Sequence, residues 1–134
     1  MFAPHRSQAQ AYSAVQMETG VQAADPHRLI DLLLEGALSA IAAASCAIER
    51  GDTAAKGRAI SRAVGIVDEG LRGALDLKAG GQVAATLNDL YRCVLLRLTQ
   101  ANLQSDLAAL RECSALLTPL RSAWRAIEPQ RLAQ

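Results

Sequence analysis

The sequence has 134 residues, of which 51% are hydrophobic but only 3% aromatic, and its formal net charge is +1 at pH 7. This length predicts one domain with its own core, and the scarcity of aromatic residues favours closely packed aliphatic helices over strands. Charges of both signs are interspersed, which excludes the basic surface typical of nucleic-acid-binding proteins. We therefore predict no nucleic-acid partner.

Neither a signal peptide nor membrane insertion is predicted. The amino terminus lacks the apolar core of a signal peptide, and no uninterrupted apolar run approaches the roughly 18 residues of a membrane span. Cys46, Cys93 and Cys113 lie in apolar helical stretches without the close spacing of a zinc site. We expect reduced, buried cysteines, no bound metal and a cytoplasmic location.

Residues 1–24 are small or polar and lack sustained periodicity, so we expect a mobile amino-terminal arm or short helix there. Its apolar residues include Tyr12 and Val15. Two interpretations stay open: a disordered tail, or an arm whose Tyr12 and Val15 dock reversibly on the folded body.

The first long helix is predicted over residues 26–50. Asp25 is suited to cap its amino end, and Pro26 fits the first helical position because no donor is lost there. Apolar residues recur at spacings of three and four, and further leucines widen the stripe: Leu29, Leu32, Leu34 and Leu38. This excess indicates either a wider core contact or a surface kept for a partner.

The second helix, predicted over residues 51–76, is unusual in its glycines. Its apolar stripe is Ile60, Val64, Val67, Leu71 and Leu75, whereas its interior glycines are Gly57, Gly65, Gly70 and Gly73. Each interior glycine costs about 1 kcal/mol relative to alanine. Either a neighbouring helix or a bound partner must approach this backbone, so we expect the helix to be both a wall of the core and the floor of a groove.

Two further helices are predicted over residues 82–104 and 107–127, the former after a flexible turn at residues 78–81. Leu95, Leu96 and Leu103 lie outside the stripe of the third helix. Pro119 should kink or split the fourth helix, at a cost of about 3 kcal/mol. The sequence thus predicts an all-α fold: an antiparallel four-helix bundle over residues 25–128, followed by a tail at 129–134.

The sequence contains none of the residue patterns by which enzymes place catalysis in a helical bundle. His27 resembles the phosphoacceptor of helical phosphotransfer modules, but it lies at a helix end and is more simply a surface or capping residue. Asp31 and Arg125 are spaced like solvated helix faces. The inward arginines and lysines of a chorismate-mutase-like enzyme do not occur in the stripes. We predict a non-enzymatic protein without cofactors that binds another polypeptide by helix-in-groove contacts, with phosphotransfer or another interaction module as the alternative.

Short motifs then succeed one another along nearly the whole chain. They are Ala11-Tyr12 and Val15, followed by ADPHRLI at 24–30, EGA at 35–37, GD at 51–52, AKG at 55–57, AIS at 59–61, GL at 70–71, LD at 75–76, GG at 80–81, Asn88, LY at 90–91, RL at 97–98, QANL at 100–103, Asp106 and AW at 123–124. In this order the sequence resembles FliS, the family of flagellar secretion chaperones that bind flagellin. Cys93, Gly65 and Pro119 depart from the family pattern.

The resemblance implies a cytoplasmic chaperone that binds the disordered carboxy-terminal segment of flagellin, prevents its premature polymerisation and delivers it to the flagellar type III export gate without ATP. It also implies that the arm occupies a groove when flagellin is absent. The residues that we predict to contact flagellin combine the resemblance with the apolar stripes: Tyr12, Val15, Leu29, Leu33, Gly57, Ile60, Val64, Val67, Leu71 and Leu75.

Overall fold

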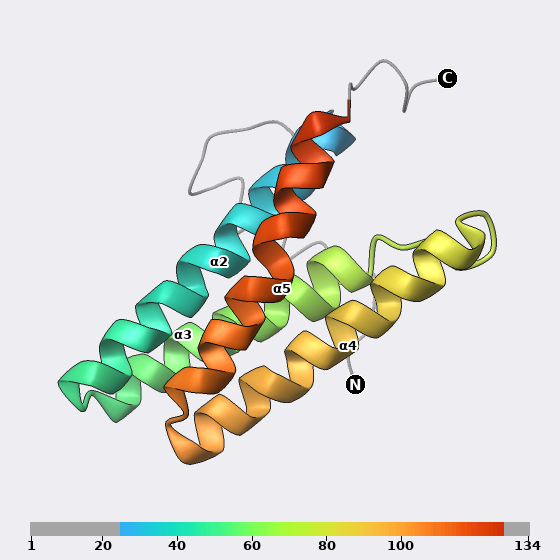
Figure 1. Ribbon diagram of the computed structural model, residues 1–134. Helices are drawn as coiled ribbons and strands as arrows, with labels where there is room; N and C mark the ends of the chain where they lie inside the picture. The colour runs from blue at the N-terminus through green and yellow to red at the C-terminus, as the bar shows by residue number, and fades with distance from the viewer. Residues whose placement is uncertain (1–24, 128–134) are drawn as a thin grey trace.

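The computed structural model describes residues 25–127, which fold into a bundle of antiparallel helices without a strand (Figure 1). The helices are α2 (Pro26–Arg50), α3 (Thr53–Gly65) with its π-helical continuation η1 (Ile66–Arg72), α4 (Gly81–Gln104) and α5 (Leu107–Ala126). In the bundle α2 packs on α3 and α5, and α4 packs on α5 and η1. The all-α bundle is therefore confirmed, whereas the predictions for the arm, Tyr12 and Val15 included, lie outside the described residues.

Each helix begins where a short acidic side chain or a glycine turn allows it. The carboxylates of Asp25, Asp52 and Asp106 accept hydrogen bonds from backbone N–H groups at the starts of α2, α3 and α5, as N-caps do. The bond from the Ala55 N–H lowers the pKa of Asp52. Gly51 ends α2 with φ 73°, a left-handed conformation that glycine adopts without steric cost. These caps confirm the predicted bounds of the first helix.

Three of the four surplus leucines of α2 belong to the core, and the fourth, Leu38, is partly buried against it. Leu29, Leu32 and Leu34 are at most 5% exposed, and they pack in the same cluster as the predicted stripe. Although α2 is long and apolar enough to span a membrane, with a mean hydropathy of 1.7 in its most apolar window, 56% of that window is buried inside the bundle. A wider core contact therefore accounts for most of the apolar excess of this helix.

The second helix departs from the prediction in both length and regularity. It ends at Arg72 rather than at residue 76, and its last turns are π-helical. A π-helix places one more residue in each turn than an α-helix does. Adjacent pairs therefore face the core, Ile66 with Val67 and Gly70 with Leu71, and Leu75 falls beyond the helix. Gly73 lies at the end of η1, so it is not an interior glycine as predicted.

Hydrogen bonds shape the turn that links η1 to α4. The carboxylate of Asp76 accepts hydrogen bonds from the backbone N–H groups of Lys78 and Ala79, at 3.1 and 3.0 Å. The Gly80 N–H donates to the Asp76 carbonyl at 2.8 Å. A Cβ atom at Gly80 would lie 2.6 Å from the Cβ of Ala84, so this turn requires glycine.

Two further predictions need correction. Of the kink or split predicted at Pro119, the split is wrong, since α5 is continuous from Leu107 to Ala126. Pro119 and Ala115 both lie on the exposed side of α5, where water can bind the carbonyl that the proline leaves without a donor. Of the cysteines only Cys113 is buried, whereas Cys46 and Cys93 are exposed.

Two buried polar side chains join helices that are distant in sequence. The Nζ of Lys56, 8% exposed, donates to the Asn102 carbonyl at 3.0 Å and to Ser105 Oγ at 2.9 Å, which satisfies the carboxyl end of α4. Asp31, 3% exposed, accepts from Arg28 and Arg121, both at 3.1 Å. Asp31 is therefore not the solvated residue that its spacing predicts.

Candidate functional site

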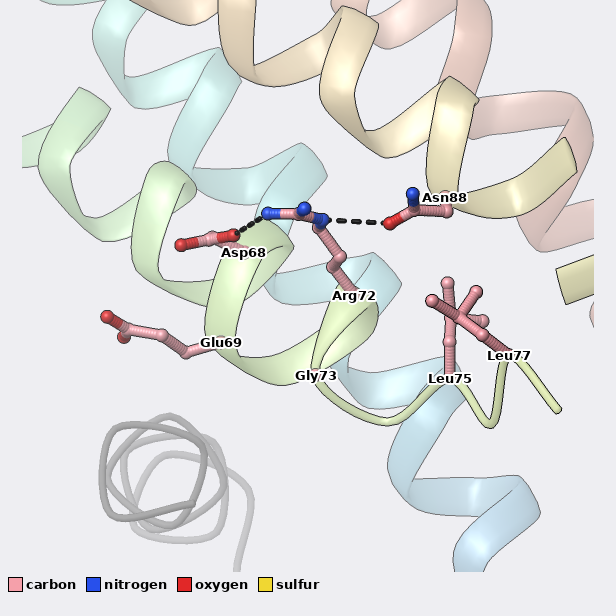
Figure 2. A pocket seen from close by; sticks show the side chains of 7 residues that line it. All are labelled: Asp68, Glu69, Arg72, Gly73, Leu75, Leu77 and Asn88. Carbon is pink, nitrogen blue, oxygen red and sulfur yellow. Dashed lines mark hydrogen bonds and ion pairs between the residues drawn. The ribbon is translucent and has the colours of Figure 1, made fainter. Parts of the chain in front are cut away.

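Three hollows follow one another along the seam between η1 and α4. The largest, about 440 Å³, is lined by both charged and aliphatic side chains: Asp68, Glu69, Arg72, Gly73, Leu75, Leu77 and Asn88 (Figure 2). We call it the mixed hollow. Figure 2 shows Arg72 reaching between Asp68 and Asn88, with Glu69 turned away from that pair.

The second hollow, which we call the arginine hollow, has a volume of about 230 Å³ and is lined by Arg72, Arg92, Leu95, Leu96 and Thr99. The third, the aliphatic hollow, has about 140 Å³ and is lined by Ile30, Leu34, Leu71, Ala74, Leu75, Leu87, Tyr91, Leu120 and Trp124. Arg72 is common to the mixed and arginine hollows, and Leu75 to the mixed and aliphatic ones. We call the three together the η1–α4 face.

Arg72 is positioned from two helices. Its Nε donates to Asn88 Oδ1 at 2.8 Å, and its Nη1 donates to Asp68 Oδ1 at 3.0 Å (Figure 2). One bond crosses from η1 to α4, while the other stays within η1. The guanidinium is 41% exposed and keeps further N–H donors for a ligand. It is therefore a positive group fixed by bonds to two helices on a seam that carries both charged and aliphatic side chains.

Trp124, which lines the aliphatic hollow, makes a reciprocal contact with His27. Trp124 Nε1 donates to the His27 carbonyl at 2.9 Å, and His27 Nε2 lies 3.0 Å from the Trp124 carbonyl. Because a carbonyl only accepts, Nε2 carries the hydrogen of this bond. The two rings stack with centroids 4.9 Å apart. His27 thus joins the start of α2 to the end of α5, a role that neither a surface residue nor a phosphoacceptor requires.

Tyr91 forms part of the wall of the aliphatic hollow. It is 4% exposed, and burial raises its pKa from 10.0 to about 12. The phenol is neutral at physiological pH, and no Asp, Glu, Lys or Arg is among the described residues that line this hollow. A hollow with these walls suits an aliphatic side chain.

The residues predicted to contact flagellin divide into buried and accessible positions. Leu29, Leu33, Ile60, Val67 and Leu71 lie in the core and are at most 5% exposed, although Leu71 also reaches the aliphatic hollow. Gly57, Val64 and Leu75 are partly exposed. Leu75 lies between two hollows, which makes it the most accessible apolar position among those predicted within the η1–α4 face.

Several residues of the η1–α4 face were not singled out as site residues from the sequence. They include Leu77 and Leu96, which are 56% and 70% exposed, and Arg72, Asn88 and Arg92. Leu96 did carry a signal, because it falls outside the core stripe of its helix. Arg72 carried none, since its position depends on the π-helical turn.

Within residues 25–127, no group of three or more His, Cys, Asp or Glu side chains is arranged to hold a metal ion. The polar groups of the η1–α4 face include two guanidinium groups, two carboxylates, an amide and the hydroxyl of Thr99. Such a surface can bind a polypeptide through its side chains.

Comparison with known proteins supports a single family. A family model described as flagellar protein FliS matches residues 8–131. The chain belongs to the FliS family. It is 43% identical over 120 residues to the flagellar secretion chaperone FliS of Salmonella typhimurium, covering 90% of this chain and 89% of that protein. It is 44% identical over 116 residues to the flagellar secretion chaperone FliSB of Pseudomonas aeruginosa, covering 87% and 91%.

A more distant FliS, the flagellar secretion chaperone of Bacillus subtilis, is 32% identical over 121 residues, covering 90% of this chain and 88% of its own length. The resemblance found in the sequence motifs is therefore confirmed. Because these FliS proteins are named as chaperones, membership of the family associates the bundle with flagellar secretion and with a chaperone role.

Proposed function

We propose that this FliS protein is a cytoplasmic export chaperone that binds the carboxy-terminal segment of flagellin and delivers it to the flagellar type III export gate. Binding masks a segment that would otherwise polymerise too early. The protein acts by binding alone, without catalysis, cofactor or nucleic acid. The match to the FliS family over residues 8–131 carries this proposal, since the relatives are named as flagellar secretion chaperones.

The η1–α4 face supports the proposal because it offers what an amphipathic helix requires. Three adjoining hollows alternate aliphatic walls with charged groups along one seam. Leu77 and Leu96 expose more than half of their surface there. A helix that buries its apolar residues in such hollows removes this surface from water, which stabilises the complex by roughly 25 cal/mol per Å² of apolar surface.

Titration calorimetry with a peptide of the last several tens of residues of the cognate flagellin tests the proposal. We expect a one-to-one complex with a negative heat-capacity change, because a disordered segment buries apolar surface as it becomes ordered. The helical circular dichroism signal of the mixture should exceed the sum of the signals of the separate protein and peptide. Absence of binding heat at several temperatures would refute the proposed function.

Two exposed leucines on α4 form a matched pair that locates the surface. Leu96 is 70% exposed and lines the arginine hollow, whereas Leu103 is 80% exposed and lines none of the three hollows. Leu96→Asp should raise the Kd for the peptide about tenfold or more, which corresponds to roughly 1.4 kcal/mol. Leu103→Asp should leave it unchanged.

Both substitutions should change the free energy of unfolding by no more than about 0.5 kcal/mol, because both side chains are exposed. Equal effects of the two variants on binding would place flagellin elsewhere on the bundle. Core positions such as Val67 are unsuitable for this test, since a charge there would unfold the protein.

A further inference from the structure

We infer that the arginine hollow binds a carboxylate side chain of the partner polypeptide, with Arg92 as the residue that contacts it and Arg72 beside it. The inference rests on the proposed function, in which the partner is the flagellin segment. It adds a chemical requirement: the bound helix carries an acidic residue next to an aliphatic one.

Two guanidinium groups line this hollow without an acidic neighbour among its described lining residues. Arg72 donates a hydrogen bond to Asn88 of α4. Arg92 follows Asn88 by four positions, so Asn88 and Arg92 lie on the same side of α4. Arg72 has Asp68 as a counter-ion. Arg92 has neither a hydrogen bond nor an ion pair to any residue in the range 25–127.

Several other arginines of the bundle are paired, and Arg111, which like Arg92 forms no hydrogen bond or ion pair within residues 25–127, lines none of the three hollows. Arg28 and Arg121 form ion pairs with Asp31, and Arg97 pairs with Glu112 at 2.7 Å. Two positive groups at one hollow, one of them without a counter-ion, create a local potential that attracts an anion. A guanidinium also matches a carboxylate geometrically, because its parallel N–H groups can bind both oxygens.

The walls of the hollow indicate a carboxylate that belongs to a polypeptide. Leu95 and Leu96 lie beside the arginines, and Leu96 exposes 70% of its surface. A small free anion would leave this aliphatic surface in water. A helix with Asp or Glu three or four positions from Leu, Ile or Val places both side chains on one face, so it covers the leucines and reaches the guanidinium groups together.

Calorimetry with the flagellin peptide and the variant Arg92→Gln tests this inference. Exposed ion pairs contribute up to about 1 kcal/mol, so we expect Kd to rise about three- to fivefold at low ionic strength. Raising the salt concentration should weaken the wild-type complex more than the variant complex, because salt screens the lost interaction. Arg111→Gln, an exposed arginine of α5 that lines none of the three hollows, is the matched control and should bind like the wild type.

A set of peptides in which each Asp or Glu is replaced by its amide identifies the carboxylate. For one of them the effects of the peptide change and of Arg92→Gln should be non-additive, because either change removes the same ion pair. If the wild type binds but Arg92→Gln matches it in Kd and salt dependence, or no peptide change couples to Arg92, the inference is wrong and the proposed function stands. If the wild type fails to bind the peptide, both fall.

Discussion

At the scale of single residues, Asp31 shows how the bundle uses charge inside its helical seam. This carboxylate is 3% exposed and lies within 3.1 Å of Arg28 and Arg121, with Arg125 at 3.8 Å. The arginines themselves remain 24 to 59% exposed. A buried charge is tolerated only where it is paired and hydrogen-bonded, so α2 and α5 are joined by a carboxylate that depends on its partners.

Replacing this carboxylate by an amide should destabilise the fold. Asp31→Asn keeps the volume but leaves the arginines without their shared counter-ion, and we expect it to lower the free energy of unfolding by about 2 kcal/mol. The 3–5 kcal/mol typical of a broken buried pair is reduced because the arginines are partly hydrated. Urea unfolding followed by circular dichroism measures the change.

Glu35→Gln is the matched control for this prediction. Glu35 is 53% exposed and its only contact with the cluster is an ion pair to Arg121 at 3.4 Å. Its loss should cost less than about 1 kcal/mol, as for other surface pairs. If the two variants were equally stable, the buried position of Asp31 would have no energetic consequence.

The sequence did not reveal this cluster, and the reason is physical. Asp31 follows the spacing of a solvated face of its own helix, but the arginine that pairs with it comes from a position 90 residues later. His27 is similar, because its contact with Trp124 spans 97 residues. Local spacing predicts which side of a helix is apolar; it does not predict which distant side chain covers a polar residue.

At the scale of single elements, the glycines of the second helix differ from the glycine of the following turn in the space around them. A Cβ atom at Gly57 would meet nothing within 4 Å, and one at Gly65 would meet only Glu69 Oε2 at 3.6 Å. Close packing against another described helix does not explain either residue. By contrast, Gly80 in the following turn has no room for a side chain.

Alanine at these positions should therefore act in opposite directions. Gly57→Ala should raise the free energy of unfolding by about 0.5–1 kcal/mol, because alanine favours the helix and fits the space. Gly80→Ala should lower it, since the new Cβ would lie 2.8 Å from the Asp76 carbonyl oxygen. Thermal and urea unfolding of both variants measure the two changes.

Gly57→Ala also tests whether the glycine serves the partner. If the variant were more stable but bound the peptide more weakly, Gly57 would be supported as a contact. Functional sites often carry residues that lower the stability of the fold. Unchanged binding would remove Gly57 from the proposed surface without affecting the η1–α4 face.

The helix bounds were predictable where capping chemistry sets them and were not where packing does. Asp25, Gly51 and Asp106 fix their helix ends through local hydrogen bonds or backbone conformation, and all three positions agree with the sequence prediction. The π-helical end of the second helix has no such local signal. Leu75 therefore lies in the turn after η1, although its spacing from Leu71 suggested another turn of helix.

At the scale of the whole molecule, the core sets a response to alkaline pH. Burial raises the pKa of Tyr91 from 10.0 and that of Cys113 from 9.0, each to about 12. Below pH 9 the folded and unfolded states both keep these protons. Between pH 9 and about 12 the unfolded chain binds fewer protons than the folded one, so the free energy of unfolding falls as pH rises.

Urea unfolding between neutral and alkaline pH checks this direction. Each of the two groups should lower the free energy of unfolding by up to about 1.4 kcal/mol per pH unit over the range in which it titrates. Tyr91→Phe should reduce the loss of unfolding free energy above pH 10, while the loss that comes from Cys113 remains. A stability that did not change over this range would show that both groups ionise equally easily in the folded protein.

The architecture of the molecule was predictable from the sequence to a greater extent than its surface was. Apolar stripes and caps predicted the bundle, yet they did not separate core from surface on every helix. Leu29, Leu32 and Leu34 of α2 are buried, while Leu96 of α4 is exposed. Both appear as leucines beside a stripe. The spacing of leucines along one helix does not show which of its sides a neighbouring helix covers: α2 packs against α3, η1 and α5, and α4 packs against the same three elements.

The contact between His27 and Trp124 has a further consequence for folding. It closes a segment of 97 residues, and the entropy lost in closing so long a loop is compensated only when the intervening helices are already packed. We therefore expect it to form late during folding and to open early during local unfolding. Because Trp124 lines the aliphatic hollow, the hollow's mouth can widen through fraying of the last turn of α5 while the remaining helices stay folded.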